Sequence, residues 1–254
     1  MDLPIHRLMS VGSRKEVQAL LAAGRVVTEA LARMRSLVRP GATTADLDRA
    51  AAEVFARHGA RSAPQLAYDF PGVTCISVND EAVHGIPGSR RIAAGDLVKL
   101  DVTAELRGYM ADAAVTVPVP PVAAEDAELC AAAEAGLLAG LAVARAGSTT
   151  GAVGAAVEAE VERRGFRVLR ELAGHGIGRA IHEPPSVPNF GVAGQGARLT
   201  DGLVITIEPI ISSRTRSTRH AGDGWTVATA DGRRSAHVEH TIIVRRGRPL
   251  ILTA

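Results

Sequence analysis

The chain has 254 residues, 46% of them hydrophobic, which is enough to bury a sizeable core in one large domain. Its formal net charge is only +2, so the charge balance does not indicate a nucleic-acid partner. No apolar stretch approaches the roughly 18 to 20 residues that cross a bilayer, and residues 1–7 lack the apolar core of a signal peptide. We therefore expect a cytoplasmic protein in which Cys75 and Cys130, too few for a disulfide framework, are reduced.

Helical patterns come in two pairs along the chain. The first pair is a helix over residues 15–37 and a helical pattern that follows residue 44 and ends at residues 57–59. The second pair is a helix over residues 124–144 and a pattern that follows residue 150 and ends at residues 163–165. A similar segment precedes the second helix of each pair, at residues 39–44 and again 106 residues later at 145–150. In both copies a glycine leads into threonines that can cap a helix, and Gly59 and Gly165 fit the position where a helix stops.

This internal repeat predicts one domain, residues 1–254, made of two similar halves at about residues 14–122 and 123–248. Each half reads helix, helix, then strands. The β-rich runs at residues 203–207 and 240–244 are bounded by turn-forming or charged residues. The plan is α+β, and two copies of so long a period are too few for a solenoid.

Two aspartates, Asp101 and Asp112, flank a turn in the β-rich segment 97–112. If a hairpin is centred between Leu106 and Arg107, with Gly108 helping to close it, the aspartates face each other across the two strands. Directly opposed Cβ atoms lie roughly 4.5 to 5.5 Å apart, where like charges are destabilising. A shared divalent cation would neutralise them, and oxygen ligands suit harder metals such as Mn or Fe(II). The alternative is a solvated hairpin with scattered acids.

The second half of the chain supplies three more candidate ligands. Glu208 ends an apolar strand and Glu239 lies within another, so each carboxylate is costly to bury without a metal or an ion pair. His175 stands between two glycines, which allow close approach of backbone and ligand. A lone histidine there would fit a structural role. Together, however, two aspartates, two glutamates and one histidine fit a site with two metal ions roughly 3.5 to 4 Å apart.

Six short motifs carry a family resemblance. They lie at residues 79–87, 99–103, 174–179, 207–209, 223–227 and 239–241. Their order and spacing are specific although each is weak alone, and through them the chain resembles type I methionine aminopeptidases from about Glu16 to Val244. The resemblance implies the pita-bread fold, an α+β architecture with a pseudo-twofold repeat and a central antiparallel sheet covered by helices.

The resemblance also implies a metal centre with assigned ligands. Asp112 and Glu239 would bridge two divalent ions, Asp101 would complete one ion, and His175 and Glu208 would complete the other. Water or hydroxide between the ions would be the nucleophile, with Glu208 accepting its proton, and the substrate α-amine would bind the Asp101 metal. The ligand set accepts Mn, Fe, Co or Zn.

Two further histidines match the family's non-ligand positions. The resemblance places His84 near the substrate amide nitrogen and gives His182 a role in stabilising oxyanion charge. His6, His58 and His220 match no motif, and we expect them at the surface.

For the methionine pocket, aromatic residues near the motifs are candidates because sulfur–aromatic contacts contribute roughly 0.3 to 1.5 kcal/mol. The candidate substrate-binding residues are Tyr68, Phe70, Cys75 and Trp225, together with Gln65, which stands near the place of a small residue in relatives. Phe55 and Phe166 are expected in the core.

Three other departures from the family lie near the predicted site. Ile181 and Ile210 replace a common Phe and Met. His237, two residues before Glu239 and expected on the same strand face, stands where Gln is common. It would either tune the metal or form a hydrogen bond to one of its ligands.

The resemblance implies an enzyme that removes the initiator methionine from nascent chains with a small second residue. It would act near the ribosome exit as a monomer, without nucleic-acid or membrane partners. Alternatives are an Xaa-Pro peptidase with the same five ligands, a non-catalytic pita-bread binding module, and a specialised paralogue that trims a dedicated peptide or resists an inhibitor. The full set of ligands and histidines argues against the binding module.

Overall fold

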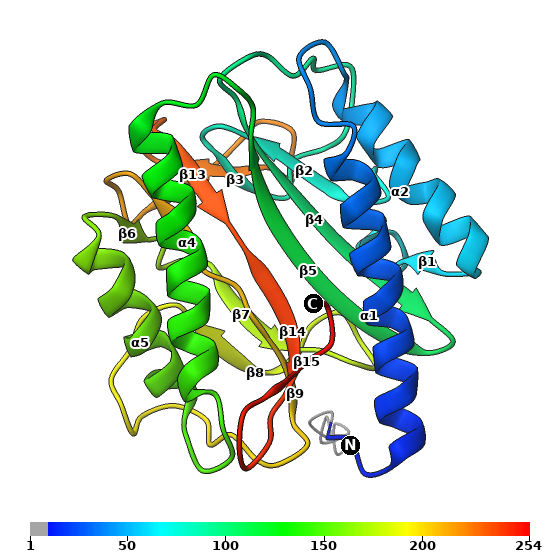
Figure 1. The fold of residues 1–254 in the computed structure, drawn as a ribbon, viewed down its shortest axis with the longest axis vertical. Helices are drawn as coiled ribbons and strands as arrows, with labels where there is room; N and C mark the ends of the chain where they lie inside the picture. Colours follow the sequence, from blue (N-terminus) through cyan, green and yellow to red (C-terminus); the bar gives the residue numbers. More distant parts are fainter. Residues whose placement is uncertain (1–9) are drawn as a thin grey trace.

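A nine-stranded sheet whose neighbouring strands all pair antiparallel runs through the computed structural model, which describes residues 10–254 (Figure 1). The described helices are α1 Arg14–Arg35, α2 Thr44–His58, α3 Ala63–Tyr68, α4 Ala124–Val143 and α5 Thr150–Arg163. The strands of the large sheet are β1 Arg61–Ser62, β2 Cys75–Val78, β4 Leu97–Leu106, β5 Tyr109–Pro118, β7 Ala173–Gly176, β8 Glu183–Pro188, β9 Val204–Ile207, β14 Glu239–Ile243 and β15 Leu250–Ile251. One smaller sheet contains β13 Ser235–His237, β10 Ile210–Ser212 and β6 Arg167–Val168. The other contains β11 Thr218–His220, β12 Val227–Thr229 and β3 Glu81–Val83.

The helix boundaries follow the local capping signals. The Thr43 side chain accepts a hydrogen bond from Asp46 N in a reciprocal capping box, and Gly59 ends α2 in the left-handed region. Thr149 caps α5 in the same way without the reciprocal bond, and Gly165 follows Arg164 at the end of that helix. These two threonine caps and the four long helices are confirmed. The division of the chain into pseudo-symmetric halves at about residues 14–122 and 123–248 stays a prediction.

Helices lie along one face of the large sheet (Figure 1). Helix α1 packs across β4 and β5 and against α2, whereas α4 packs against α5 and contacts β13. Phe55 is buried in the core under α1 and α2, and Phe166 in the core under α4 and α5, as expected. In the described part of the chain, no helix is both long and apolar enough to cross a membrane.

Side chains alternate along the strands between the helix-facing core and the opposite, polar face of the large sheet. On β4, the side chains of Val98, Leu100 and Val102 join the helix-facing core. Because successive side chains of a strand point to opposite faces, Asp101 and Thr103 lie on the other face. The same rule holds on β9, where Ile205 and Ile207 are in the core and Thr206 is not.

The β4–β5 hairpin corrects the predicted register. Its turn consists of Arg107 and Gly108, both with positive φ (52° and 83°), as a two-residue type I′ turn requires. Leu106 therefore pairs with Tyr109, and Asp112 lies opposite Thr103 rather than opposite Asp101. Asp101 lies opposite Ala114, so the two aspartates share a face but sit diagonally.

Candidate metal centre

A pocket of about 790 Å³, including its open mouth, lies on the polar face of the sheet. All five predicted ligands line it: Asp101, Asp112, His175, Glu208 and Glu239. They come from β4, β5, β7, the end of β9 and β14, segments far apart in the sequence. The two predicted non-ligand histidines, His84 and His182, also line it. Of the histidines expected at the surface, His58 and His220 are exposed, whereas His6 lies outside the described residues.

Threonine hydroxyls hold the buried carboxylates in place. Thr103 Oγ1 donates to Asp112 Oδ2 at 2.7 Å, and Thr206 Oγ1 donates to Glu208 Oε1 at 2.8 Å. Thr241 Oγ1 accepts from Asp112 N and donates to Asp112 O, each at 2.8 Å. Sequence reasoning missed these threonines. The sequence signal that could have found them is the two-residue period of side chains along a strand. Each threonine stands two residues from a candidate ligand and so shares its face of the strand.

The electrostatics of the site call for a cation. Burial, reinforced by neighbouring carboxylates, raises the pKa of Asp101 and Glu239 well above the usual range. Burial likewise raises the pKa of Asp112 to about 6 and that of Glu208 to about 8. Among the described residues, Asp112 Oδ1 and Glu239 Oε1 are buried oxygens without a hydrogen-bond partner. Clustered carboxylates with unpaired oxygens are expensive to bury unless a metal ion binds them, so this donor set fits divalent metal.

The imidazole of His175 is oriented for metal binding. Its Nδ1 lies 2.9 Å from the carbonyl of Gly176, and because a carbonyl only accepts, Nδ1 carries the proton. Nε2 then presents its lone pair to the site, 3.5 Å from Glu208 Oε1. Ligand atoms of Asp112, His175 and Glu239 lie within 4.8 Å of one another, as do those of Glu208, His237 and Glu239.

His182 and His84 lie at the edge of the pocket and have exposed side chains. The rings of His175 and His182 meet edge to face, with centroids 4.2 Å apart. The hydroxyl of Tyr68 lies 2.6 Å from His182 Nδ1, so the tyrosine orients this ring. His84 adopts a positive φ of 58°, a conformation uncommon outside glycine and found at functional sites.

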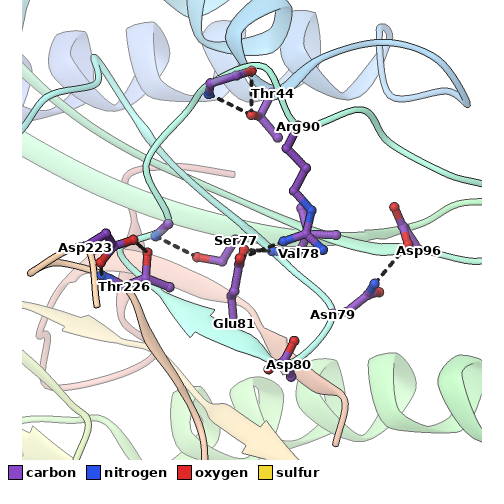
Figure 2. A network of polar contacts seen from close by, with 12 residues as sticks. Thr44, Ser77, Val78, Asn79, Asp80, Glu81, Arg90, Asp96, Asp223 and Thr226 are labelled. Atoms are coloured by element: carbon purple, nitrogen blue, oxygen red, sulfur yellow. Dashed lines mark hydrogen bonds and ion pairs between the residues drawn. The ribbon is translucent and has the colours of Figure 1, made fainter. Parts of the chain in front are cut away.

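A polar network anchors the segment that leads to His84 (Figure 2). Glu81 Oε2 accepts from Val78 N at 2.7 Å, and the other oxygen of Glu81 accepts from Arg90 Nη1 at 2.6 Å. Ser77 Oγ accepts from Gly85 N at 3.0 Å. These bonds hold the chain on both sides of His84. The same view shows Asp223 accepting from Thr226 Oγ1 at 2.6 Å, a contact that fixes the loop carrying Trp225.

Most of the predicted side-chain pocket comes together. Phe70 and Trp225 pack edge to face with centroids 5.1 Å apart, and buried Cys75 lines the same pocket. Ile181 and Ile210 line it as well. Tyr68, 46% exposed, stands at the mouth.

Gln65 does not join the pocket, contrary to expectation. It is exposed on α3 and lines a separate surface hollow with Phe55 and Arg61. The short helix α3 turns this face to solvent while Pro64, one residue earlier, lines the main pocket. Helical geometry therefore turns Gln65 away from the pocket in which the family resemblance had placed it.

Comparison with known proteins agrees with this geometry. The sequence pattern of metallopeptidase family M24 matches residues 18–246. The chain is 42% identical over 247 residues to methionine aminopeptidase 2 of Bacillus subtilis, an alignment that covers 96% of this chain and 99% of that protein. The chain belongs to the methionine aminopeptidases of metallopeptidase family M24. A methionine aminopeptidase of Treponema pallidum is 43% identical over 234 residues, covering 90% of this chain and 91% of its own.

Solved structures of family M24 relatives confirm the predicted fold. A methionine aminopeptidase of Thermotoga maritima superimposes with a TM-score of 0.94 at 34% identity, covering 97% of this chain and 99% of that one. A prolidase of Pyrococcus furiosus gives a TM-score of 0.78 at 20% identity, with 97% and 66% covered, and shares the fold alone. The pita-bread fold and the use of divalent metal follow from this membership, which bears out the family resemblance read from the motifs.

Proposed function

We propose that this protein is a cytoplasmic methionyl aminopeptidase that removes the initiator methionine from nascent chains with a small second residue. The observation that carries the proposal is the meeting of five candidate ligands and two histidines in one pocket, in a chain 42% identical to a methionine aminopeptidase. The substrate would be the free N-terminus of a new polypeptide near the ribosome exit, and the enzyme would act as a monomer.

Two divalent ions, drawn from Mn, Fe, Co or Zn, would be held by the five ligands. Asp112 and Glu239 would bridge them, Asp101 would complete one site, and His175 with Glu208 the other. Bound divalent ions supply Lewis acidity, which polarises a peptide carbonyl and lowers the pKa of water. The unpaired Asp112 Oδ1 and Glu239 Oε1 support the bridging assignment, because each leaves one carboxylate oxygen wholly free for an ion. The second oxygen of Asp112 accepts one hydrogen bond from Thr103 and keeps another lone pair for the second ion.

The remaining residues would bind and orient the substrate. Phe70, Cys75 and Trp225 form an apolar wall suited to a methionine side chain, whose sulfur contacts aromatic rings favourably. Glu208 would take up a proton from attacking water, since its carboxylate lines the pocket beside the other candidate ligands. His182, held by Tyr68, would stabilise oxyanion charge, and His84 would lie near the amide nitrogen of the scissile bond.

The rival activities make different predictions about peptides. An Xaa-Pro peptidase would cleave Ala-Pro peptides, a binding module would cleave none, and a specialised paralogue would cleave a narrow set. The apolar pocket wall favours the methionine assignment over proline-directed cleavage.

The proposal is tested with metal-depleted protein resupplied with Mn²⁺ or Co²⁺ and assayed on Met-Ala-Ser, Met-Lys and Ala-Pro peptides. We expect metal-dependent release of methionine from Met-Ala-Ser, little from Met-Lys, and none by the Asp112→Asn variant. Silence on every methionine peptide with metal bound would overturn the assignment, and cleavage of Ala-Pro alone would replace it with the Xaa-Pro activity.

A further inference from the structure

His237 is the most enclosed imidazole of the site. His237 is only 1% exposed, and it lines the same pocket as the five candidate ligands. Among the described residues, both of its ring nitrogens are buried without a hydrogen-bond partner. A buried polar group without a partner costs free energy, so this ring needs a partner that the protein itself does not supply.

The distances around His237 fit a shared ion better than direct hydrogen bonds. Nε2 lies 3.8 Å from Glu208 Oε2 and 3.7 Å from Glu239 Oε2. Both separations exceed the roughly 2.7 to 3.2 Å of an N–H···O hydrogen bond. Two atoms bound to one ion at about 2.0 to 2.2 Å can lie up to about 4.4 Å apart. Nε2 of His237 therefore lies, from each of the two carboxylate oxygens, at a distance that two donors to one cation can have.

The two carboxylate oxygens of Glu208 have similar surroundings. Its Oε1 faces Nε2 of His175 at 3.5 Å, and its Oε2 faces Nε2 of His237 at 3.8 Å. Each carboxylate oxygen thus has one imidazole nitrogen at a similar, non-bonded distance.

The protein holds the backbone of His237 by hydrogen bonds but makes none to its ring nitrogens. Thr116 Oγ1 accepts from His237 N and donates to His237 O, each at 2.8 Å. This clamp holds the residue where β13 ends, two residues before β14 begins at Glu239. The ring therefore points into the pocket while neither of its nitrogens is engaged by the protein.

We infer that His237 is a further protein ligand, which binds through Nε2 the ion held by Glu208 and Glu239. This inference rests on the proposed metal centre and adds a second imidazole to it. Imidazole suits Zn and Fe, whereas carboxylates alone suit Mn, so His237 should shift the metal preference of the centre toward the former.

The test counts the imidazoles bonded to the metal. Protein with ¹⁵N-labelled histidine is loaded with ¹¹³Cd²⁺, and couplings between the metal nucleus and ring nitrogens are measured by NMR. Such a coupling passes through a bond, so a ring that is only hydrogen-bonded gives none. We expect two coupled imidazoles in the wild type, one in His237→Gln, and two in His240→Gln. His240 is a matched control on β14, because its Nδ1 pairs with Thr253 Oγ1 at 2.9 Å and it does not line the pocket.

Metal affinity gives a second readout that is independent of catalysis. His237→Gln should lower Zn²⁺ affinity by at least about tenfold and Mn²⁺ affinity less, whereas His240→Gln should change neither. If His237→Gln does not fold, the number of couplings in the wild type decides alone.

A single coupled imidazole in the wild type, with Cd²⁺ bound, would overturn the inference and leave the proposed function standing. Failure of the wild type to bind Cd²⁺, Zn²⁺ or Mn²⁺ would instead overturn the metal centre itself, and the inference with it.

Discussion

Asp112 and Thr103 lie directly opposite each other on β5 and β4, and the hydroxyl of Thr103 donates to the Asp112 carboxylate at 2.7 Å. The register that separates Asp112 from Asp101 thus gives it a fixed neutral donor. One oxygen of Asp112 is held by this bond, and the other, Oδ1, has no partner among the described residues. Thr103 is therefore a positioning residue for a proposed ligand.

Thr103→Val should weaken metal binding while leaving the fold intact. Partners that hydrogen-bond to metal ligands typically contribute 10- to 100-fold in affinity, so we expect a loss of about tenfold in Mn²⁺ affinity by titration calorimetry. Thr28→Val is the control, because Thr28 Oγ1 donates at 3.0 Å to Gly24 O within α1 and Thr28 does not line the pocket of the candidate ligands. Equal affinities in both variants would show that Asp112 is held adequately without the hydroxyl.

Tyr68→Phe should lower kcat on Met-Ala-Ser several-fold, with a smaller change in KM. The variant loses the contact of 2.6 Å that orients His182 but keeps the ring at the pocket mouth. Removing an oxyanion-stabilising group outright costs roughly 100-fold or more, so His182→Ala should be the more severe variant. The other tyrosine of the chain, Tyr109, contacts Arg179 instead, and Tyr109→Phe should retain wild-type kcat. An unchanged kcat in Tyr68→Phe would remove this orienting role.

The buried ammonium of Lys99 should make stability depend on pH. Its Nζ donates to Asn79 O at 2.6 Å and to Ser235 Oγ at 3.2 Å, and burial lowers its pKa from 10.5 to about 7. Between these values the unfolded chain holds one more proton than the folded chain. The contribution of Lys99 to the free energy of unfolding should therefore rise with pH across that window.

Urea unfolding of the metal-loaded protein at about pH 7 and pH 9.5 measures this slope. Lys99→Met should flatten it, because methionine does not titrate. Lys15→Met should keep the wild-type slope, because Lys15 is exposed and is the only other lysine of the chain. Parallel slopes in all three proteins would show that Lys99 titrates normally.

The two helix caps should differ in strength. Thr43 makes a reciprocal capping box with Asp46, and Thr149 makes a single cap bond to Ala152 N. Thr43→Ala should lower the free energy of unfolding by about 1 to 2 kcal/mol and Thr149→Ala by about 0.5 to 1 kcal/mol, both measured by urea titration. The reverse order would mean that tertiary packing, not the box, dominates at α2.

Sequence alone was sufficient for the features that depend on local chemistry. The ends of the long helices follow from Thr43, Gly59 and Thr149, whose side chains or conformations act within a few residues. The β-rich runs became β9 and β14 within one residue of their predicted bounds. The candidate ligands were found from local surroundings: a hairpin for the two aspartates, apolar strands for the two glutamates and flanking glycines for His175. The family resemblance then assigned their roles.

Tertiary structure decided how those residues meet. The two-residue turn at Arg107 and Gly108 moved Asp112 opposite Thr103, and the helical geometry of α3 turned Gln65 to a different face from Pro64, away from the pocket. The place of His237 beside Glu208 depends on β13 ending where β14 begins, a break that the strand pattern did not predict. The reason is physical. Caps and the hairpin register are set by neighbours in sequence, and the sequence interpretation placed that turn one residue too early. Which side chains face the pocket, and how the ligands are spaced, are set by packing between segments far apart in the chain.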